Sequence, residues 1–430
     1  MKYNIQRYIS IDNQTRKLGV EKMNQDANHH ALNYQAYASE TFEHLHRHPE
    51  ISFHEYQTRK FIRQELENFG YTDIETDVGG GGVIARLKGD KPGPTVAFRA
   101  DMDALQIQEE TELAYKSAFD GVMHACGHDA HTTILLTAAK YLIHLKEEIA
   151  GTLVFLFQHA EEVKPGGAKS IMASGALDDV DKIFGLHVSG EKAFDGTISY
   201  HEGLATANSD TFAIEVHGKG GHAATPHQNV DVTLTAAYLI QQLQSIVSRH
   251  KNPMDPGVVT IGNFHAGNGV ANVMANVASL NGTIRTYNPD LRALAKKDLF
   301  SLSEDIAAAH GASVKIDFID GYPALYNHPT ETQTVVDIFK ERFGQDMINE
   351  KPASMGGEDF AYYVQKIPGL FYFIPAGAHP DGENYPHHHP KFEIDQRCLM
   401  LGLETILTIV NHYVIESEVE AYVESRYSEY

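Results

Sequence analysis

The stretch Gly151–Gln158, with the sequence GTLVFLFQ, decides the fold class of this chain. A short, continuous apolar run is typical of a strand that is buried on both faces, as in a parallel sheet covered by helices. The preceding segment Ala130–Lys146 has helical periodicity, and the apolar segment Lys182–His187 predicts a further strand. Alternating strands and helices of this kind predict an α/β domain with a mixed, mostly parallel sheet.

The segments nearer the N-terminus continue this pattern. The residues before about His30 lack periodicity, and we interpret them as a flexible extension. After them we expect two helices, the second closed by Gly70, and then two strands. These elements are Asn33–His46, His54–Phe69, Gly82–Leu87 and Pro94–Arg99.

The pattern changes after about Ser209 and returns to α/β near Pro323. Between these points the order is strand, helix, strand, strand, helix and strand, which is the split-βαβ arrangement of a ferredoxin-like domain. We therefore expect residues 209–320 to be inserted into an α/β domain formed by residues 1–208 and 321–430. The inserted elements are Thr211–His217, Asp231–Arg249, Val258–Phe264, Val277–Thr286, Leu291–His310 and Ser313–Ile319, and the α/β domain resumes with Gly369–Pro375 and Leu399–Tyr413.

Composition limits the possible functions. A chain of 430 residues is too long for a single core and favours two domains. Its 35 basic and 57 acidic residues give a net charge of −22, which excludes a nucleic-acid partner because phosphate binding needs a basic surface. Two cysteines, Cys126 and Cys398, cannot form a disulfide framework and fit a reducing, cytoplasmic compartment. The polar segment Met1–Lys22 and the lack of long apolar runs predict neither a signal peptide nor a membrane span.

Four clusters of metal-binding residue types follow predicted strands or lie in nearby loops. Open α/β sheets bind ligands outside the carboxyl ends of their strands, so this placement indicates a ligand site. The clusters are FRADMDAL with Asp101 and Asp103, HACGHDAH with Cys126 and His128, FQHAEE with Glu161 and Glu162, and KIFGLH with His187.

Each cluster also has a structural explanation. A lone histidine such as His187 is usually a core or surface residue, adjacent glutamates usually form a solvated face, and a lone Cys126 is usually a small buried apolar residue. The combination favours a metal site, because thiolate, imidazole and carboxylate together suit Zn²⁺ or a similar divalent ion.

The pair Glu161–Glu162 allows a division of roles. Neighbouring side chains on an extended segment point in different directions, so one carboxylate can bind a metal while the other acts as a general base. Asp103 can accept the second N–H of a histidine ligand and thereby set its tautomer.

These motifs resemble those of the M20 metallopeptidase family, in particular its branch of aminoacylases, hippurate hydrolases and indole-acetyl-amino-acid hydrolases. The resemblance runs from Leu45 to Asp395 and so covers most of the chain. It rests on the motifs LHRHPEISFHEYQT, RADMDAL, MHACGHDAHT, AEE, GLH, GKGGHAATPH, GTIRT, MGGEDF and HHPKFEID.

The resemblance implies the roles of individual residues. It implies two divalent ions (Zn²⁺ or Mn²⁺, with Co²⁺ or Ni²⁺ as alternatives) and Glu161 as the catalytic base. Within the HHH run it favours His388, because the family pattern H-x-P-x-F is matched by His388, Pro390 and Phe392. The implied ligands are Cys126, His128, Glu162, His187 and His388.

The resemblance also implies a function for the inserted domain. In the family this domain is a lid and usually a dimer interface, and a lid histidine, here His222, reaches the reaction centre of the neighbouring subunit. Asn272 and Arg285 resemble lid positions that hold the substrate carboxylate, a task that suits a guanidinium because it can bind a carboxylate in a bidentate manner. The alternative for Arg285 is a charge on a strand surface.

Because the inserted domain is usually a dimer interface in the family, the resemblance also implies a homodimer.

The expected activity is hydrolysis of the amide bond of small N-acyl amino acids, which releases a carboxylic acid and a free amino acid. A dipeptidase or carboxypeptidase of the same family is the nearest alternative. A hydrolase with Cys126 as nucleophile is a second alternative, which a chelator would spare. A non-catalytic metal-dependent binding protein is a third, and the presence of Glu161 argues against it.

Overall fold

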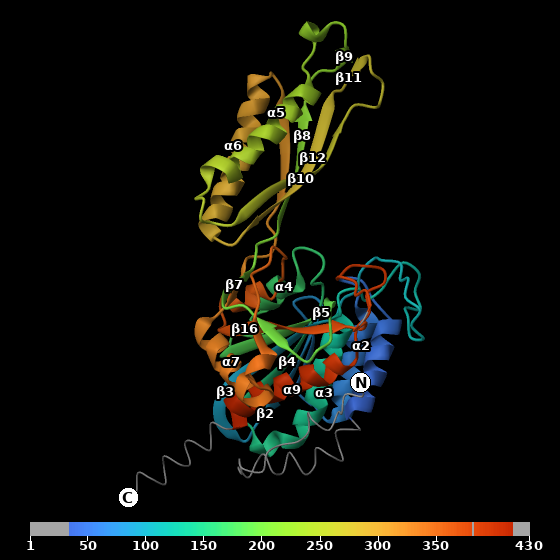
Figure 1. The fold of residues 1–430 in the computed structure, drawn as a ribbon, viewed down its shortest axis with the longest axis vertical. Helices are drawn as coiled ribbons and strands as arrows, with labels where there is room; N and C mark the ends of the chain where they lie inside the picture. Colours follow the sequence, from blue (N-terminus) through green and yellow to red (C-terminus); the bar gives the residue numbers. More distant parts are fainter. Residues whose placement is uncertain (1–33, 381, 416–430) are drawn as a thin grey trace, which may run out of the picture.

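The computed structural model describes residues 34–380 and 382–415, and it contains a larger and a smaller domain joined by two segments of chain (Figure 1). The predicted N-terminal extension, Asn33 and the C-terminal residues 416–430 lie outside the described residues. In Figure 1 the smaller domain stands above the larger one, and the connecting segments form a narrow waist between them.

An eight-stranded sheet forms the centre of the larger domain. Its order is β1-β2-β4-β3-β5-β16-β6-β15, and the four central strands β4, β3, β5 and β16 are mutually parallel. The antiparallel strands β1 and β2 complete one edge. The bounds are β1 Ile74–Val78, β2 Gly82–Lys88, β3 Lys91–Asp101, β4 Ala150–Gln158, β5 Lys182–Ala193, β6 Ile198–Tyr200, β15 Ile348–Glu350 and β16 Gly369–Gly377.

Helices cover both faces of this sheet. A helix over residues 34–47 shares one apolar core with α2, α3, α7 and α9, whereas α4 and α8 pack on a second core across the sheet. Strand β4 is buried at all but one position, as expected for a strand between two helical layers, and the predicted fold class is confirmed. The helices are α2 Tyr56–Phe69, α3 His128–Leu142, α4 Gly167–Ser174, α7 Pro329–Phe343, α8 Ala361–Val364 and α9 Arg397–Val410.

The smaller domain has one four-stranded antiparallel sheet with helices α5 and α6 on one face (Figure 1). The strand order β10-β12-β8-β13 is that of the split-βαβ arrangement expected for the insertion. Asp231 and Asn288 cap the two helices by accepting backbone N–H groups through their side chains. The bounds are β8 Asp210–His217, α5 Val232–Ser245, β10 Gly257–Ala266, β12 Val277–Thr286, α6 Pro289–Ala309 and β13 Ser313–Ile319.

Two small antiparallel pairs complete the fold. Strands β9 (Gly221–His222) and β11 (Val273–Met274) pair at the tip of the smaller domain. Strands β7 (Gly203–Thr206) and β14 (Leu325–Asn327) pair where the chain leaves and re-enters the larger domain.

One helical segment in the described part of the chain, Arg397–Ile415, is long and apolar enough to cross a membrane by length and composition alone. Half of it is buried, and Leu399, Leu403 and Ile406 belong to the main core of the larger domain. A helix in the core of a domain can be equally long and apolar, so packing against this core explains the apolar composition of the segment.

A buried ionic group ties the N-terminal helix to the start of α3. His46 Nδ1 lies 2.7 Å from Asp129 Oδ2, and His46 Nε2 lies 3.3 Å from Glu109 Oε1. Burial lowers the pKa of His46, but the two carboxylates outweigh it and raise the pKa to about 9. The native state therefore holds a buried imidazolium between two carboxylates.

This group predicts a loss of stability at alkaline pH. The pKa of His46 is about 9 in the fold and about 6.5 in the unfolded chain, so its stabilisation is complete below pH 6.5 and is lost as the pH rises through 9. The difference corresponds to about 3 kcal/mol. Urea unfolding of the wild type and of His46→Gln at several pH values should show their difference shrinking between pH 6.5 and 10. The exposed His144→Gln serves as control, and a difference independent of pH would contradict this role of His46.

Candidate metal centre

The turn Cys126–Gly127–His128 places a thiol and an imidazole on the same site. Gly127 has a φ of 88°, and a Cβ at this position would lie 2.3 Å from Val188 Cγ2, so the close approach of β5 requires glycine. His128 opens α3, and Cys126 Sγ lies 3.5 Å from His187 Nε2. The turn therefore directs both side chains toward the loop and strand that carry the other candidate ligands.

Potential donor atoms meet in two groups that share Cys126. In one group, the donor atoms of Cys126, His128 and His187 lie within 4.8 Å of one another; in the other, those of Cys126, Glu162 and His388 do. The chain could thus hold two ions with the Cys126 thiolate common to both. All five residues that the family resemblance implied as ligands belong to these groups.

Two buried atoms in these groups fit a cation. Among the described residues, His128 Nε2 and Glu162 Oε1 are buried without a hydrogen-bond partner. A buried polar atom without a partner costs free energy, so atoms of this kind usually serve a ligand, a water or an ion. His388 completes the second group, with its Nε2 3.3 Å from Glu162 Oε1.

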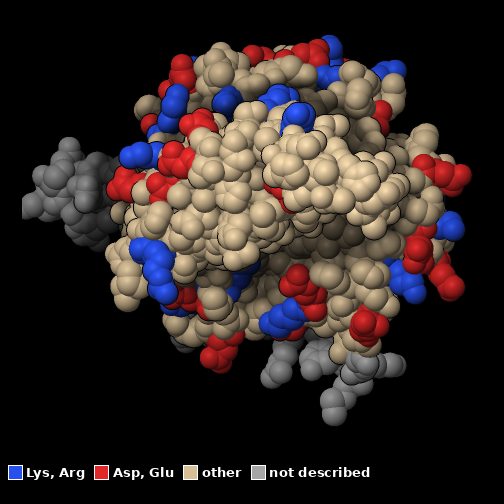
Figure 2. Space-filling view, turned by 90° about the horizontal axis from the view of Figure 1, so that it is seen from above, with Lys and Arg blue, Asp and Glu red and all other residues tan. Residues whose placement is uncertain are grey.

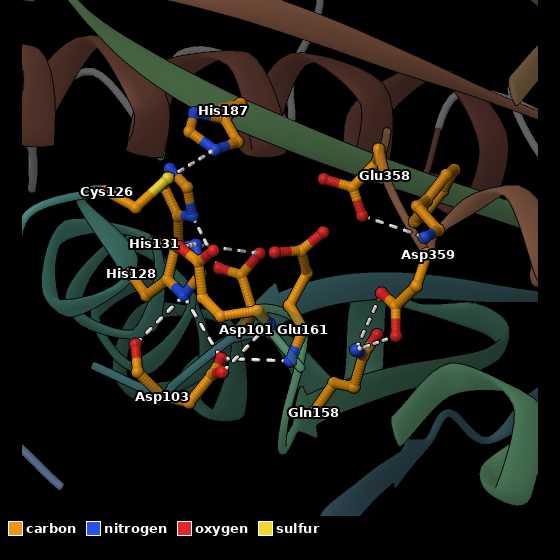
Figure 3. Close-up of polar contacts among 12 residues, drawn as sticks. Asp101, Asp103, Cys126, His128, His131, Gln158, Glu161, His187, Glu358 and Asp359 are labelled. Atoms are coloured by element: carbon orange, nitrogen blue, oxygen red, sulfur yellow. Dashed lines mark hydrogen bonds and ion pairs between the residues drawn. The ribbon is translucent and has the colours of Figure 1, made fainter. Parts of the chain in front are cut away.

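Asp103 connects three parts of the site (Figure 3). Its side-chain oxygens accept the backbone N–H groups of Glu161 at 3.1 Å and Glu162 at 3.0 Å. His128 Nδ1 lies 3.0 Å from the Asp103 carbonyl oxygen and 3.2 Å from its carboxylate, which assigns the proton to Nδ1 and leaves the Nε2 lone pair for a metal. Ser52 Oγ donates to the same carboxylate at 2.6 Å. Asp103 therefore positions the glutamate pair and one ligand together.

Glu161 lies among the candidate ligands, and one of its carboxyl oxygens is within 4.8 Å of donor atoms of His128 and Glu162. Burial, followed by the negative charges of Glu358 and Glu162, raises its pKa well above the usual range. A carboxyl oxygen of Glu161 lies within 4.8 Å of one of Glu358 and one of Asp359, and Figure 3 shows the side chains of Glu161 and Glu358 directed toward each other. A carboxylate in this environment has an increased affinity for a proton, as a general base that later acts as an acid requires.

Arg99 supplies the opposite charge. Its fully buried guanidinium pairs with Asp101 at 2.7 Å, Asp359 at 2.9 Å and Glu358 at 3.1 Å. Burial raises the pKa of all three carboxyls and Arg99 lowers it. The pKa of Asp101 falls well below its usual range, whereas the pKa values of Glu358 and Asp359 stay raised, the latter to about 8. Sequence reasoning assigned no role to Arg99 or Glu358, although both stand in the quoted motifs RADMDAL and MGGEDF.

Several neighbouring histidines have other partners. His131 binds Asp101 Oδ1 through Nδ1 at 2.6 Å and accepts the Val188 N–H through Nε2 at 2.9 Å, so both ring nitrogens are engaged within the protein. His387 Nε2 lies 2.9 Å from the Val188 carbonyl oxygen, and His389 stacks on Tyr385. Within the HHH run, His388 is the residue whose ring enters a ligand group.

The implied catalytic His222 and the implied substrate-binding residues Asn272 and Arg285 lie at the two ends of the smaller domain. His222 is on β9, and Ala223 N donates to the Asn272 carbonyl oxygen at 3.1 Å, so His222 and Asn272 are together at the tip remote from the larger domain (Figure 1). Arg285 is on β12 near the waist, where a Cβ on Gly357 would lie 3.2 Å from its Nη1. Arg285 therefore lies next to the segment that carries Glu358 in its own chain, whereas His222 and Asn272 lie at the far end of the smaller domain.

The chain matches the model of peptidase family M20/M25/M40 over residues 97–412. It belongs to this family. M20 relatives include YhaA of Bacillus subtilis, 43% identical over 84% of this chain and 91% of YhaA. The N-acetyl-L-cysteine deacetylase of Bacillus subtilis is 39% identical over 83% of each chain. The thermostable carboxypeptidase 1 of Saccharolobus solfataricus is 36% identical over 83% of this chain and 90% of its own length.

A solved M20 structure has the same architecture. The YXEP protein of Bacillus subtilis, described as a dinuclear metal binding peptidase, superimposes with a TM-score of 0.74 at 32% identity, covering 88% of this chain and 98% of that chain. These M20 relationships identify the present chain as a hydrolytic enzyme, and the predicted family and enzyme class are confirmed.

If each donor group holds one ion, substitutions in the site should change the number of bound ions in a predictable way. Chelator-treated protein that is reconstituted with Mn²⁺ or Zn²⁺ should bind two ions per chain by elemental analysis. His388→Ala should bind one, because only the second group loses a donor, and Asp103→Asn should weaken binding about 10- to 100-fold through the lost orientation of His128. His389→Ala, a change at the next residue, should retain two. Two tightly bound ions in His388→Ala would contradict the assignment.

Proposed function

We propose that this M20 enzyme is a metal-dependent amidohydrolase that cleaves N-acyl amino acids into a carboxylic acid and a free amino acid. The observation that carries the proposal is the buried carboxyl of Glu161, which lies within 4.8 Å of donor atoms of His128 and Glu162, outside the two groups that share Cys126, and makes no ion pair with a described residue. The similarity to the N-acetyl-L-cysteine deacetylase supports amide hydrolysis of a small N-acylated amino acid.

The proposed ligands are Cys126, His128 and His187 for one divalent ion and Cys126, Glu162 and His388 for the other. When bound, the two ions would supply a water whose pKa is lowered toward roughly 7 and would polarise the amide carbonyl. Mixed sulfur, nitrogen and oxygen donors suit Zn²⁺, Mn²⁺, Co²⁺ or Ni²⁺.

Glu161 carries the proton between reactants. Its carboxylate accepts the proton of the attacking water and then donates it to the nitrogen of the leaving amine as the C–N bond breaks. Burial and the negative charge of Glu358 favour the protonated form, so Glu161 can hold the proton through the intermediate step. His222 would donate a hydrogen bond to the carbonyl oxygen, and Arg285 and Asn272 would bind the substrate carboxylate.

A cysteine-nucleophile mechanism has less support. Burial and the charges of Glu162 and Glu161 raise the pKa of the Cys126 thiol, whereas a nucleophilic cysteine needs surroundings that lower it. Because one of the relatives is a carboxypeptidase, peptide hydrolysis is the second candidate function.

The position of His222 at the lid tip supports action across a homodimer. Figure 2 looks down on the molecule from above the lid and shows a broad central area without charged residues. Segments 220–230 and 264–277 contain no Asp, Glu, Lys or Arg. Phe264, Val270 and Val273 are 42%, 49% and 50% exposed there. An uncharged, partly apolar tip of this kind suits pairing with a second copy about a two-fold axis.

The role of Glu161 predicts that Glu161→Gln retains both ions and the fold while kcat falls by about 10²- to 10⁴-fold. A panel of N-acetyl, N-benzoyl and N-indoleacetyl amino acids and of dipeptides should show the N-acyl amino acids as the better substrates by kcat/KM. Glu162→Gln is the matched variant and should lose metal. If Glu161→Gln loses metal while Glu162→Gln keeps it, the two roles are reversed.

The dimer proposal predicts complementation between inactive variants. Neither Glu161→Gln nor His222→Ala should be active alone, but mixed dimers contain one site with both residues intact. Activity should therefore return when the two proteins are mixed under conditions of subunit exchange, toward about a quarter of the wild-type value, since half of the dimers are mixed and each has one complete site. Verified exchange without recovery, or a monomer at assay concentration, would refute action across the dimer.

A further inference from the structure

The waist between the two domains contains a residue that contacts the catalytic glutamate. The chain leaves the larger domain through residues 207–209 and returns through residues 320–324, and these two segments lie side by side (Figure 1). Ser209 N donates to the Tyr322 carbonyl oxygen at 3.0 Å, and Tyr322 N donates to Ser209 Oγ at 3.1 Å. The side chain of Tyr322 then enters the larger domain, where it is 5% exposed.

The hydroxyl of Tyr322 donates a hydrogen bond to the backbone carbonyl oxygen of Glu161. This bond holds the carbonyl group of Glu161, while the Asp103 carboxylate accepts the Glu161 N–H at 3.1 Å. The preceding Ala160 has a φ of 50°, and its N–H donates to Glu55 Oε1 at 2.8 Å. The backbone around Glu161 therefore adopts a conformation uncommon outside glycine and is held by side-chain contacts rather than by a regular ladder.

The same waist segment is tied to the lid. Asp210 accepts Arg292 Nε at 2.8 Å and the Gly321 N–H at 2.8 Å, and Arg292 Nη2 also donates to the Gly321 carbonyl oxygen at 3.0 Å. Arg292 belongs to lid helix α6, and Gly321 precedes Tyr322 directly. A continuous set of hydrogen bonds thus runs from α6 through Gly321 and Tyr322 to the main chain of Glu161.

We propose that Tyr322 is a positioning residue that couples the orientation of the lid to the alignment of Glu161. Rotation of the lid about the waist moves Gly321, and the buried Tyr322 transmits that displacement to the Glu161 carbonyl oxygen. The carboxylate of Glu161 is then aligned for proton transfer in one lid position and withdrawn from alignment in another. This inference rests on the proposed role of Glu161 as general base.

Tyr362 offers a matched control. Its ring centroid lies 6.3 Å from that of Tyr322, and its hydroxyl donates to the Gly321 carbonyl oxygen at 3.4 Å. It therefore belongs to the same waist, but its hydroxyl bonds to Gly321 and not to Glu161. Tyr322→Phe and Tyr362→Phe each remove one hydroxyl from the waist, and only the first removes the bond to Glu161.

The kinetic test compares Tyr322→Phe, Tyr362→Phe, Glu161→Gln and the double variant Tyr322→Phe/Glu161→Gln. We expect Tyr322→Phe to lower kcat about 10- to 100-fold, with KM and metal content within about twofold of wild type, because alignment of a base within about an ångström controls rates on this scale. Tyr362→Phe should stay within about twofold. In the Glu161→Gln background, Tyr322→Phe should cause no further loss, as a residue that acts through Glu161 must. An unchanged kcat in Tyr322→Phe, an equal loss in Tyr362→Phe, or a full additional loss in the double variant would overturn the proposal.

Hydrogen–deuterium exchange tests the same contact without turnover. The amides of Ala160, Glu161 and Glu162 all donate to buried carboxylates, so they should exchange slowly. A peptide covering residues 159–164 should exchange several-fold faster in Tyr322→Phe and at the wild-type rate in Tyr362→Phe. Unchanged exchange in Tyr322→Phe would overturn the proposal even if no substrate were cleaved. If the peptide exchanges faster in Tyr322→Phe but Glu161→Gln is fully active, the proposed role of Glu161 as general base is wrong. The contact between Tyr322 and the Glu161 backbone would still be supported.

Discussion

The buried guanidinium of Arg99 is the interaction on which the rest of the centre depends. It lies on β3 and pairs with Asp101 on the same strand and with Glu358 and Asp359 from the part of the chain that follows the lid. Its Nε donates to Gln158 at the end of β4 at 2.8 Å. Since desolvating an ion costs several kcal/mol, a buried guanidinium is stable only while these partners surround it. Arg99 therefore connects the two separated parts of the larger domain near the carboxyl ends of β3 and β4, where Glu161 lies.

The surroundings of Glu161 follow from this arrangement. Arg99 keeps Glu358 close to Glu161, and Glu358 in turn contributes to the raised pKa of Glu161. On the other side, Asp103 accepts the N–H groups of both glutamates and the Nδ1 proton of His128. One carboxylate thus holds the imidazole of His128 and the backbone of both glutamates together, which is consistent with the different roles proposed for the two glutamates. The lid adds a third constraint through the waist, where Tyr322 binds the Glu161 carbonyl oxygen.

Sequence reasoning was most successful where a local pattern carries the information. The apolar run of β4 and the helical period of α5 and α6 specify their elements directly, because burial on one or two faces dictates the residue types. Helix α7 was missed because it begins with the polar sequence PTETQ and its buried apolar residues Val335, Val336 and Phe339 occur only from its middle onward. Strand β5 continues past His187 to Ala193, so this residue lies within the strand and not at its end.

The partners of buried polar groups could not be derived in the same way. That Arg99 pairs with Glu358 and Asp359, more than 250 positions away, depends on the order of strands in the sheet, which local periodicity does not report. The hydroxyl of Tyr322 likewise contacts Glu161 only because the returning waist segment lies against the loop that follows β4. The candidate ligands were accessible from sequence because their residue types and family motifs are distinctive, whereas the choice of Cys126 as the donor common to both groups required coordinates.

The central claim is that two ions share the Cys126 thiolate while Glu161 remains unbound beside them. Anomalous diffraction from crystals grown with Mn²⁺ or Zn²⁺ and recorded at the absorption edge tests it most directly. The account predicts two anomalous peaks per chain, both within bonding distance of Cys126 Sγ, one contacting His128 and His187 and the other Glu162 and His388. A single peak, or a peak bonded to Glu161 in place of Glu162, would contradict it.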